Sequence, residues 1–201
     1  QRRKASRAGS VEAIRQREAL AAQDVDLIGR VALGDRAAFA VLYRGYQPRL
    51  RRFLERMTQA PHLVDEIVND TMLVVWRKAH TYDMKSKVST WIFAIACRKA
   101  LTAMKRAGRG QVELPEDIAD SPLRGPESTV QRQQLGALLR RSLARLPANH
   151  RAVVELTYFN EFAYREIAQI MQCPVDTVKT RMFHARLKLK AMLSDHAEEV
   201  P

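Results

Sequence analysis

Apolar side chains recur at helical spacing along most of this chain, and that periodicity restricts the chain to an all-helical fold. The recurrence is clearest over residues 62–80, where apolar residues come in adjacent pairs every four positions and so line one face of a helix. The pairs are Leu63 and Val64, Ile67 and Val68, Thr71 and Met72, and Val75 and Trp76. No convincing run alternates apolar and polar residues as a half-buried strand does. We therefore predict helices and no strands.

The periodic stretches fall into two groups, which predict two small helical domains joined by an extended linker. In the first domain, over residues 23–107, the predicted helices are 24–33, 36–57, 62–80 and 91–106. In the second, over residues 130–195, they are 130–146, 148–159, 163–171 and 175–193. The predicted N-caps of the first domain, whose short polar side chains can accept hydrogen bonds from a helix's first amides, are Asp24 or Asp26, Asp35, and Ser89 or Thr90.

The segments outside these domains differ in composition. Residues 108–129 contain three prolines, three glycines and five acidic residues against two arginines, which is typical of a linker. Residues 1–22 begin with a basic cluster and are predicted to be a flexible basic extension, and residues 196–201 are predicted to be a tail.

The overall charge favours a polyanionic partner. The chain carries 34 lysines and arginines against 22 acidic residues, a formal net charge of +12. Basic side chains that neutralise phosphates release condensed counterions, which drives binding to nucleic acid. The charge alone does not separate DNA from RNA or from an anionic lipid surface.

Cysteine usage indicates a reduced compartment and no metal centre. Cys97 and Cys173 are the two cysteines of the chain, with no CxxC pair and no histidines at metal-ligand spacing. We therefore expect no disulfide, no metal and no cofactor, and we expect the protein in the cytoplasm. The longest apolar run, Trp91–Cys97, is too short to cross a bilayer, so no membrane insertion is expected.

Residues 160–190 have the spacing of a helix-turn-helix. A short helix meets a turn at residues 172–174, and a second helix follows with its own apolar stripe. The apolar residues are Tyr164, Ile167, Ala168 and Met171 in the first helix and Val178, Met182, Ala185 and Leu189 in the second.

The opposite face of the second helix is basic, and no acidic residue occurs between Thr177 and Lys190. Cations there can hold phosphates, while polar and apolar tips can meet base edges. The predicted DNA-contacting residues are Lys179, Thr180, Arg181, Phe183, His184 and Arg186. An ordinary solvated basic helix is the alternative interpretation, and no role is assigned to the outward-facing Leu187.

A cluster of acidic residues lies beside the apolar stripe of residues 62–80. Acidic side chains around an exposed apolar centre suggest a basic protein partner for a chain of positive net charge. Acidic residues near a helix start are also favoured by the helix dipole alone, which is the alternative. The residues of this patch are Asp65, Glu66, Asn69, Asp70 and Leu73.

A loop and helix rich in cations surround Trp91. Cations beside an aromatic ring are suited to single-stranded nucleic acid, whose bases stack on such rings. For Trp91 itself, packing in the core is favoured over base stacking. The candidate residues are Lys85, Ser86, Lys87, Trp91, Arg98, Lys99 and Lys105.

Three segments taken together resemble the extracytoplasmic-function (ECF, group 4) sigma factors of the bacterial sigma-70 family. VDEIVNDTMLVVW resembles the helix that binds core RNA polymerase, and TYDMKSKVSTWIFAIACRKALTAMKR resembles the region that binds the promoter −10 element. LPANHRAVVELTYFNEFAYREIAQIMQCPVDTVKTRMFHARLKLKAML resembles the domain that reads the −35 element. Asp176 stands where many relatives have Gly or Ser.

The resemblance implies that this is not an enzyme but an initiation factor with a sigma2-like and a sigma4-like domain. It implies that the chain binds the clamp of the polymerase's largest subunit, the flap of the second, promoter DNA and an anti-sigma protein. The clamp contacts implied are Asp65, Glu66, Asn69, Asp70, Leu73 and Trp76. It assigns −10 binding to the loop and helix around Trp91 and −35 binding to the basic helix.

Two other functions remain open from the residues alone. A stand-alone helix-turn-helix regulator would bind DNA without polymerase. A nucleic-acid enzyme would use the carboxylates of the acidic patch with a divalent metal.

Overall fold

The computed structural model describes residues 19–107 and 128–197, and every element in these ranges is helical. Most of the predicted basic extension, linker and tail therefore lies outside the described residues. The first helix covers residues 19–32 and is followed by α2 (Arg36–Thr58), α3 (Pro61–Lys78), the 3-10 turn η1 (Ala79–Thr81) and α4 (Val88–Ala107). The second part contains α5 (Ser128–Ala144), α6 (Ala148–Val154), η2 (Glu155–Phe159), α7 (Tyr164–Met171) and α8 (Val175–Ala197).

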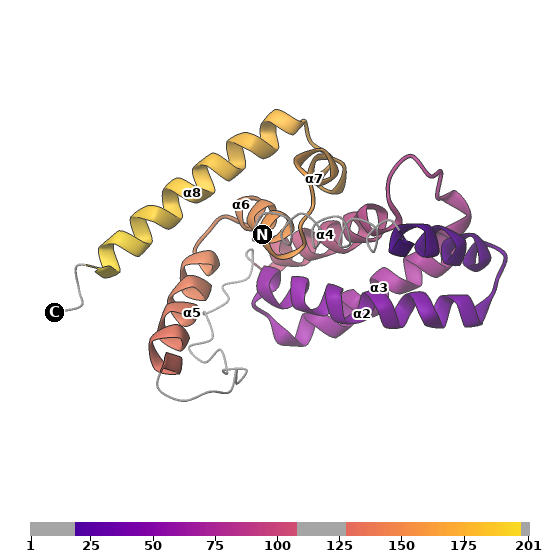
Figure 1. Ribbon diagram of the computed structural model, residues 1–201, viewed down its shortest axis with the longest axis horizontal. Coiled ribbons are helices and arrows are strands. Elements are labelled where there is room, and N and C mark those ends of the chain that lie inside the picture. The colour runs from indigo at the N-terminus through magenta and orange to yellow at the C-terminus, as the bar shows by residue number, and fades with distance from the viewer. Residues whose placement is uncertain (1–18, 108–127, 198–201) are drawn as a thin grey trace, which may run out of the picture.

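The first domain is a bundle in which α2, α3 and α4 pack on one another (Figure 1). Its centre is apolar and fully enclosed, with Tyr46, Phe53, Phe93 and Leu50 among its largest buried side chains. Asp35 caps α2 as predicted, because its carboxylate accepts hydrogen bonds from the amides of Ala37 and Ala38.

Two other predicted caps are wrong. Asp24 and Asp26 both lie inside the first helix, and the carboxylate of Asp24 accepts a 2.5 Å hydrogen bond from the hydroxyl of Tyr46. Helix α4 starts at Val88, so Ser89 and Thr90 lie within its first turn. The earlier start follows from burial, because Val88 is itself a core residue and brings the chain into the bundle before Trp91.

The second domain contains the predicted helix-turn-helix, formed by α7, a short turn and α8. Gln172 ends α7 in the left-handed conformation, with φ of 50°. The side chain of Glu166 caps the start of α7 by accepting a 2.8 Å hydrogen bond from the amide of Ala163. The helix predicted over 148–159 is α-helical only to Val154 and continues as a π-helical turn, η2.

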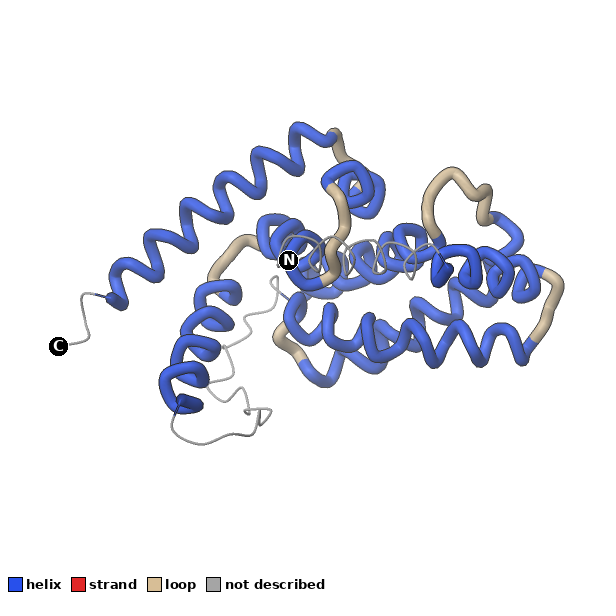
Figure 2. The backbone as a smooth tube through the Cα atoms, viewed as in Figure 1, coloured by secondary structure: helices blue, strands red, loops and turns tan. Residues whose placement is uncertain are grey.

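The two domains pack against each other. In Figures 1 and 2, α6 and α7 lie against the bundle beside α4, while α5 and α8 extend away from it. The rings of Phe93 on α4 and Phe162 before α7 meet edge to face with centroids 5.0 Å apart. Buried residues of both domains form one continuous core, yet Phe183 on α8 remains 64% exposed. The domains thus share an interface, and the predicted DNA-reading face stays outside it.

Candidate nucleic-acid and polymerase interfaces

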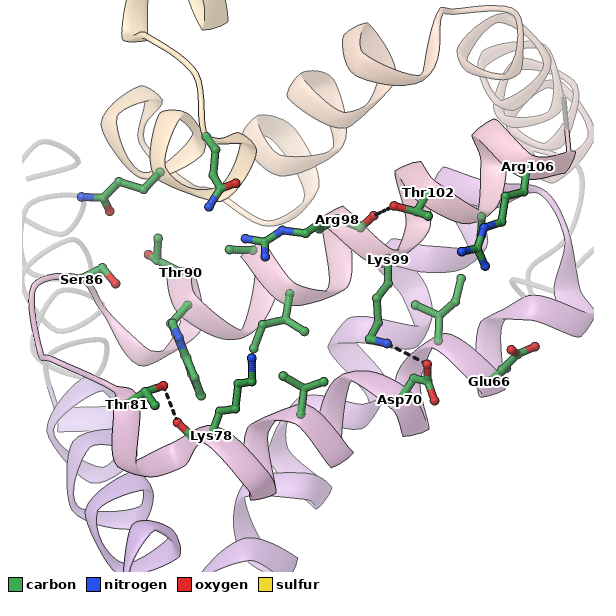
Figure 3. A pocket seen from close by; sticks show the side chains of 18 residues that line it. Glu66, Asp70, Lys78, Thr81, Ser86, Thr90, Arg98, Lys99, Thr102 and Arg106 are labelled. Carbon is green, nitrogen blue, oxygen red and sulfur yellow. Dashed lines mark hydrogen bonds and ion pairs between the residues drawn. The ribbon is translucent and has the colours of Figure 1, made fainter. Parts of the chain in front are cut away.

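A groove of about 710 Å³ runs between α3 and α4, and we call it the α3–α4 groove (Figure 3). Its floor is apolar, and its rims carry charged and hydroxyl side chains from both helices and from the loop that joins them. The polar and aromatic residues that line it are Glu66, Asp70, Lys78, Thr81, Ser86, Thr90, Trp91, Arg98, Lys99, Thr102 and Arg106, with Gln169 and Gln172 from the second domain.

Cations dominate this groove. Lys99 forms a 2.7 Å ion pair with Asp70 across it, and Lys78, Arg98 and Arg106 add positive charge along its length (Figure 3). The hydroxyl of Thr90 is buried and lacks a hydrogen-bond partner among the described residues. A buried hydroxyl without a hydrogen-bond partner carries a free-energy penalty, which a ligand that hydrogen-bonds to it would remove.

Four of the seven residues predicted for the −10 element line this groove, namely Ser86, Trp91, Arg98 and Lys99. The other three, Lys85, Lys87 and Lys105, lie outside it. The ring of Trp91 is half-buried against that of Tyr82, with centroids 5.7 Å apart, so it serves packing and still borders the groove.

A second, apolar groove of about 460 Å³ lies between α2 and α3. Arg36, Phe39 and Tyr43 line it from α2, and Asn69, Met72, Leu73 and Trp76 line it from α3; we call it the α2–α3 groove. Its edge is held by a 3.0 Å hydrogen bond from the Tyr43 hydroxyl to Oδ1 of Asn69. Leu73 is 43% exposed here, which is high for a large apolar side chain.

The six residues predicted for polymerase binding do not form one surface. Asn69, Leu73 and Trp76 line the α2–α3 groove, whereas Glu66 and Asp70 line the α3–α4 groove. Asp65 forms an ion pair with Arg51 of α2 instead. The split follows from helix geometry, because residues four apart share a face and the residues between them point elsewhere.

The predicted DNA-reading face of α8 is exposed at its centre. Phe183 and Leu187 are 64% and 57% exposed, while Val178, Met182 and Ala185 on the opposite side are buried as predicted. The guanidinium of Arg186 donates two hydrogen bonds to the hydroxyl of Tyr158, at 3.1 and 2.7 Å.

The other predicted residues of α8 have partners within the domain. Lys179 forms a 2.9 Å ion pair with Asp176, and this contact lowers the pKa of that carboxyl. The acid at the helix start is thus compensated by a neighbouring lysine. Arg181 is half-buried, and its guanidinium donates to the sulfur of Cys173, in the turn before α8, at 3.6 Å.

Sequence reasoning missed the residues that join the domains. Glu155 is fully buried and pairs with Arg56 of α2 at 2.5 Å. The one sequence signal was an acidic residue inside the apolar run 152–156. Phe39 and Tyr43 are partly buried against the core and also line the α2–α3 groove.

No group of three or more metal-ligating side chains occurs within residues 19–107 and 128–197. Over the same described ranges, no helix combines the length and apolar character that a membrane span needs.

Comparison with known proteins identifies the family. Residues 42–110 match sigma-70 region 2, and residues 136–189 match sigma-70, region 4. The ECF RNA polymerase sigma factor RpoE of Cereibacter sphaeroides is 32% identical over 163 residues, which cover 80% of this chain and 88% of that protein. The chain belongs to the ECF sigma factors of the sigma-70 family. As an ECF sigma factor, it binds core RNA polymerase and directs transcription initiation at promoters without catalysing a reaction itself.

Other ECF sigma factors are similar over most of the chain. SigM of Bacillus subtilis is 30% identical over 152 residues, covering 75% of this chain and 92% of that protein. The structure of RpoE from Bartonella quintana with the anti-sigma factor NepR matches at a TM-score of 0.64 and 25% identity, covering 78% of this chain and 96% of that one. CnrH in complex with the cytosolic domain of CnrY has the same fold, with a TM-score of 0.64 at 23% identity, covering 86% and 98%.

Proposed function

We propose that this ECF sigma factor captures the melted −10 strand in the α3–α4 groove and reads the −35 duplex with the exposed face of α8. The observation that carries the proposal is the unpartnered Thr90 hydroxyl, buried beside Trp91 in a groove lined with cations. An unstacked base gains stacking and hydrogen bonds that offset the few kcal/mol that unpairing costs.

The cations of the groove would follow the phosphates of the strand. Arg98, Lys99 and Arg106 lie on one helix, α4, and so present positive charge along one rim. Lys85, Lys87 and Lys105, outside the groove, would extend this basic path. Asp70 holds Lys99 in place in the absence of DNA, and a phosphate can replace that carboxylate.

For the −35 element, Phe183 is the proposed base contact, because an exposed aromatic ring meets the methyl group of thymine favourably. Lys179 and Arg186 would hold phosphates on either side of it, with Thr180, Arg181 and His184 completing the predicted set. The bond from Arg186 to Tyr158 orients the guanidinium before DNA arrives.

The α2–α3 groove is the proposed docking site for the clamp of the polymerase's largest subunit. Exposed apolar and aromatic side chains in a pocket are the usual centres of binding energy in protein interfaces. Leu73 and Trp76 supply that centre and Asn69 lies at its edge. Asp65, Glu66 and Asp70 lie outside this groove and would contact the polymerase beside it. The second domain would bind the flap of the second subunit.

Two further expectations follow from the relatives. RpoE of Bartonella quintana was solved with the anti-sigma factor NepR, and CnrH was solved with the cytosolic domain of CnrY. We propose an anti-sigma partner for this chain as well, released by a stress signal, and a location in the cytoplasm beside the polymerase and the chromosome.

Run-off transcription with purified core polymerase tests these surfaces. Transcripts should depend on the added chain and on both promoter elements of the template. A template with a scrambled −10 element that supports equal transcription would overturn the assignment of the α3–α4 groove. A scrambled −35 element without effect would likewise overturn that of α8.

A further inference from the structure

Two histidines from different helices of the second domain meet beside the exposed face of α8. His150 lies on α6 and His184 on α8, and their rings are edge to face with centroids 6.3 Å apart. The ring of His184 also meets that of Phe183, the proposed base contact, with centroids 5.5 Å apart. His184 is exposed and belongs to the predicted −35 residues, whereas His150 is half-buried and has no role assigned so far. The histidine pair therefore connects α6 to the predicted DNA-reading face.

The ring of His150 is poorly placed to carry a charge in the free chain. Its Nδ1 atom is buried and has no hydrogen-bond partner among the described residues. Because an imidazolium donates from both ring nitrogens, protonation would leave a buried N–H without an acceptor. Burial accordingly lowers the pKa of His150, and the neighbouring Lys188, His184 and Arg181 of α8 lower it further. His150 is therefore mostly neutral near pH 7 in the absence of DNA.

No carboxylate of the surrounding described helices compensates these cations. Helices α4, α5 and α6 contain no acidic residue. Arg151, which follows His150 on α6, donates to the carbonyl of Met57 on α2. The described acidic side chains of α2, η2, α7 and α8 already have basic partners: Glu55 with Arg51 at 3.3 Å, Glu155 with Arg56 at 2.5 Å, Glu166 with Lys87 at 2.9 Å, and Asp176 with Lys179 at 2.9 Å. An anion from outside the chain is thus the missing counter-charge of the histidine pair.

We propose that His150 and His184 together hold one backbone phosphate of the −35 duplex, and that the histidine pair takes up a proton when this phosphate binds. The inference rests on the −35 role proposed for α8. It adds a DNA-contacting residue on α6, and it makes −35 binding depend on pH.

The direction of the pH dependence follows from charge. A protonated histidine makes a charge-assisted hydrogen bond to phosphate, which is stronger than the bond that a neutral ring makes. The phosphate also offsets the repulsion that Lys188 and Arg181 exert on a charged His150, so it raises the pKa of this ring. The complex then binds more protons than the free chain does. Affinity for the −35 duplex should therefore rise as the pH falls through the range in which histidine titrates.

Fluorescence anisotropy with the reconstituted holoenzyme tests this coupling. The labelled probe is a duplex with the −35 element and a scrambled −10 element, and a second duplex has both elements scrambled. The ratio of the two Kd values removes effects of pH on the polymerase, and the ionic strength is held constant because phosphate contacts depend on salt. Between about pH 8 and about pH 6, this ratio should shift about fivefold in favour of the −35 duplex, since a one-unit rise in the pKa of one histidine allows at most tenfold.

Substitutions locate the proton. His150→Gln and His184→Gln should each flatten the pH profile, and the double variant should flatten it no further because the two rings hold one phosphate. His184→Arg, whose charge is permanent, should bind the −35 duplex tightly at both pH values. His62→Gln is the matched control, because His62 is an exposed histidine on α3 of the first domain, and it should keep the wild-type slope. Helical circular dichroism checks that each variant folds.

Neutral methylphosphonate linkages identify the anion. Placed one at a time along the −35 duplex, a single substitution should abolish the pH dependence of the wild-type complex and have little further effect on His184→Gln. If no single linkage does so, the proton is coupled to something other than a phosphate contact and the proposal is wrong.

A preference for the −35 duplex that is equal at both pH values overturns the inference and leaves the −35 role of α8 intact, because a neutral histidine at a base edge would bind without a proton. A slope that persists in both glutamine variants also overturns it. Absence of any −35 preference at either pH would refute the role proposed for α8, and this inference with it.

Discussion

Arg56 and Glu155 are 99 residues apart in the sequence, yet their side chains meet at 2.5 Å in the interface between the domains. Burial raises the pKa of Glu155, and the neighbouring Arg56 opposes that rise by stabilising the charged form. This pair is where a single substitution acts on the packing of both domains.

We expect Arg56→Met to destabilise the packing of the two domains against each other. Removing one partner from a buried pair leaves an uncompensated charge, at a cost of about 3 kcal/mol or more. Domain opening can rehydrate Glu155 and limit this loss, so the first sign should be an early transition in urea unfolding. The double variant Arg56→Met/Glu155→Gln should restore most of the loss; an unchanged first transition in the single variant would contradict the role of the pair.

Thr90→Val should weaken promoter melting without weakening the fold. The Thr90 hydroxyl is buried without a partner, so its replacement by a methyl group removes no intramolecular hydrogen bond. A lost hydrogen bond to DNA is worth about 1 kcal/mol, or roughly a fivefold loss in open-complex formation. Thr71 is the matched control, because its hydroxyl is also buried and unpartnered but lies outside the groove. Equal transcription by Thr90→Val and Thr71→Val would argue against base capture at Thr90.

Leu73→Glu should abolish tight binding to core polymerase. A charge placed in the apolar α2–α3 groove has to be desolvated on docking, which costs at least about 2 kcal/mol, or more than tenfold in affinity. Leu33→Glu provides the control, because Leu33 is 90% exposed and lies outside that groove. Fluorescence anisotropy of labelled protein titrated with core measures both, and similar affinities would place the docking surface elsewhere.

Phe183→Ala should reduce transcription from promoters with an intact −35 element by about tenfold, since burying part of an exposed Phe side chain is worth roughly 1–2 kcal/mol. Leu187→Ala removes a similarly exposed apolar side chain from the same helix, with no assigned base contact. Run-off yields on templates with and without the −35 element separate the two. Equal losses for both variants would indicate a general apolar surface.

The stability of the second domain should fall as the pH drops through about 6.5. Burial lowers the pKa of His150, and the nearby Lys188, His184 and Arg181 lower it further. In the interval between that lowered pKa and the ordinary value near 6.5, the unfolded chain binds more protons than the folded one. Stability therefore rises with pH across this interval and is complete above it. Urea unfolding of His150→Gln at several pH values should show a flatter profile; an identical slope would mean that another group titrates.

Helical periodicity predicted the fold well, because the apolar stripe of each helix marks the face that the helix buries. The inner residues of α8 and the Asp35 cap are buried and bonded as the pattern predicts. The start of α4 was missed because the predicted helix began at Trp91, whereas the side chain of Val88 already packs in the core.

The interfaces could be predicted only in part, since a sequence pattern indicates which residues leave the core but not what they meet. The sequence pattern predicted that the acidic patch forms one surface. In the structure, Glu66 and Asp70 line the α3–α4 groove, whereas Leu73 lines the α2–α3 groove. Contacts between the domains depend on residues about 70 to 100 positions apart, such as Phe93 and Phe162 or Arg56 and Glu155, and no local period encodes such a distance.

The pairing of Lys87 with Glu166 has a thermodynamic consequence for initiation. Under the proposed role of Lys87 in DNA binding, its ammonium group would have two alternative anions, the carboxylate of Glu166 or a promoter phosphate, and it could not neutralise both. Moving from one to the other exchanges one salt bridge for another, so the step is nearly balanced in energy. A promoter contact through Lys87 would therefore add little net binding energy, because forming it gives up an ion pair that the free chain already has.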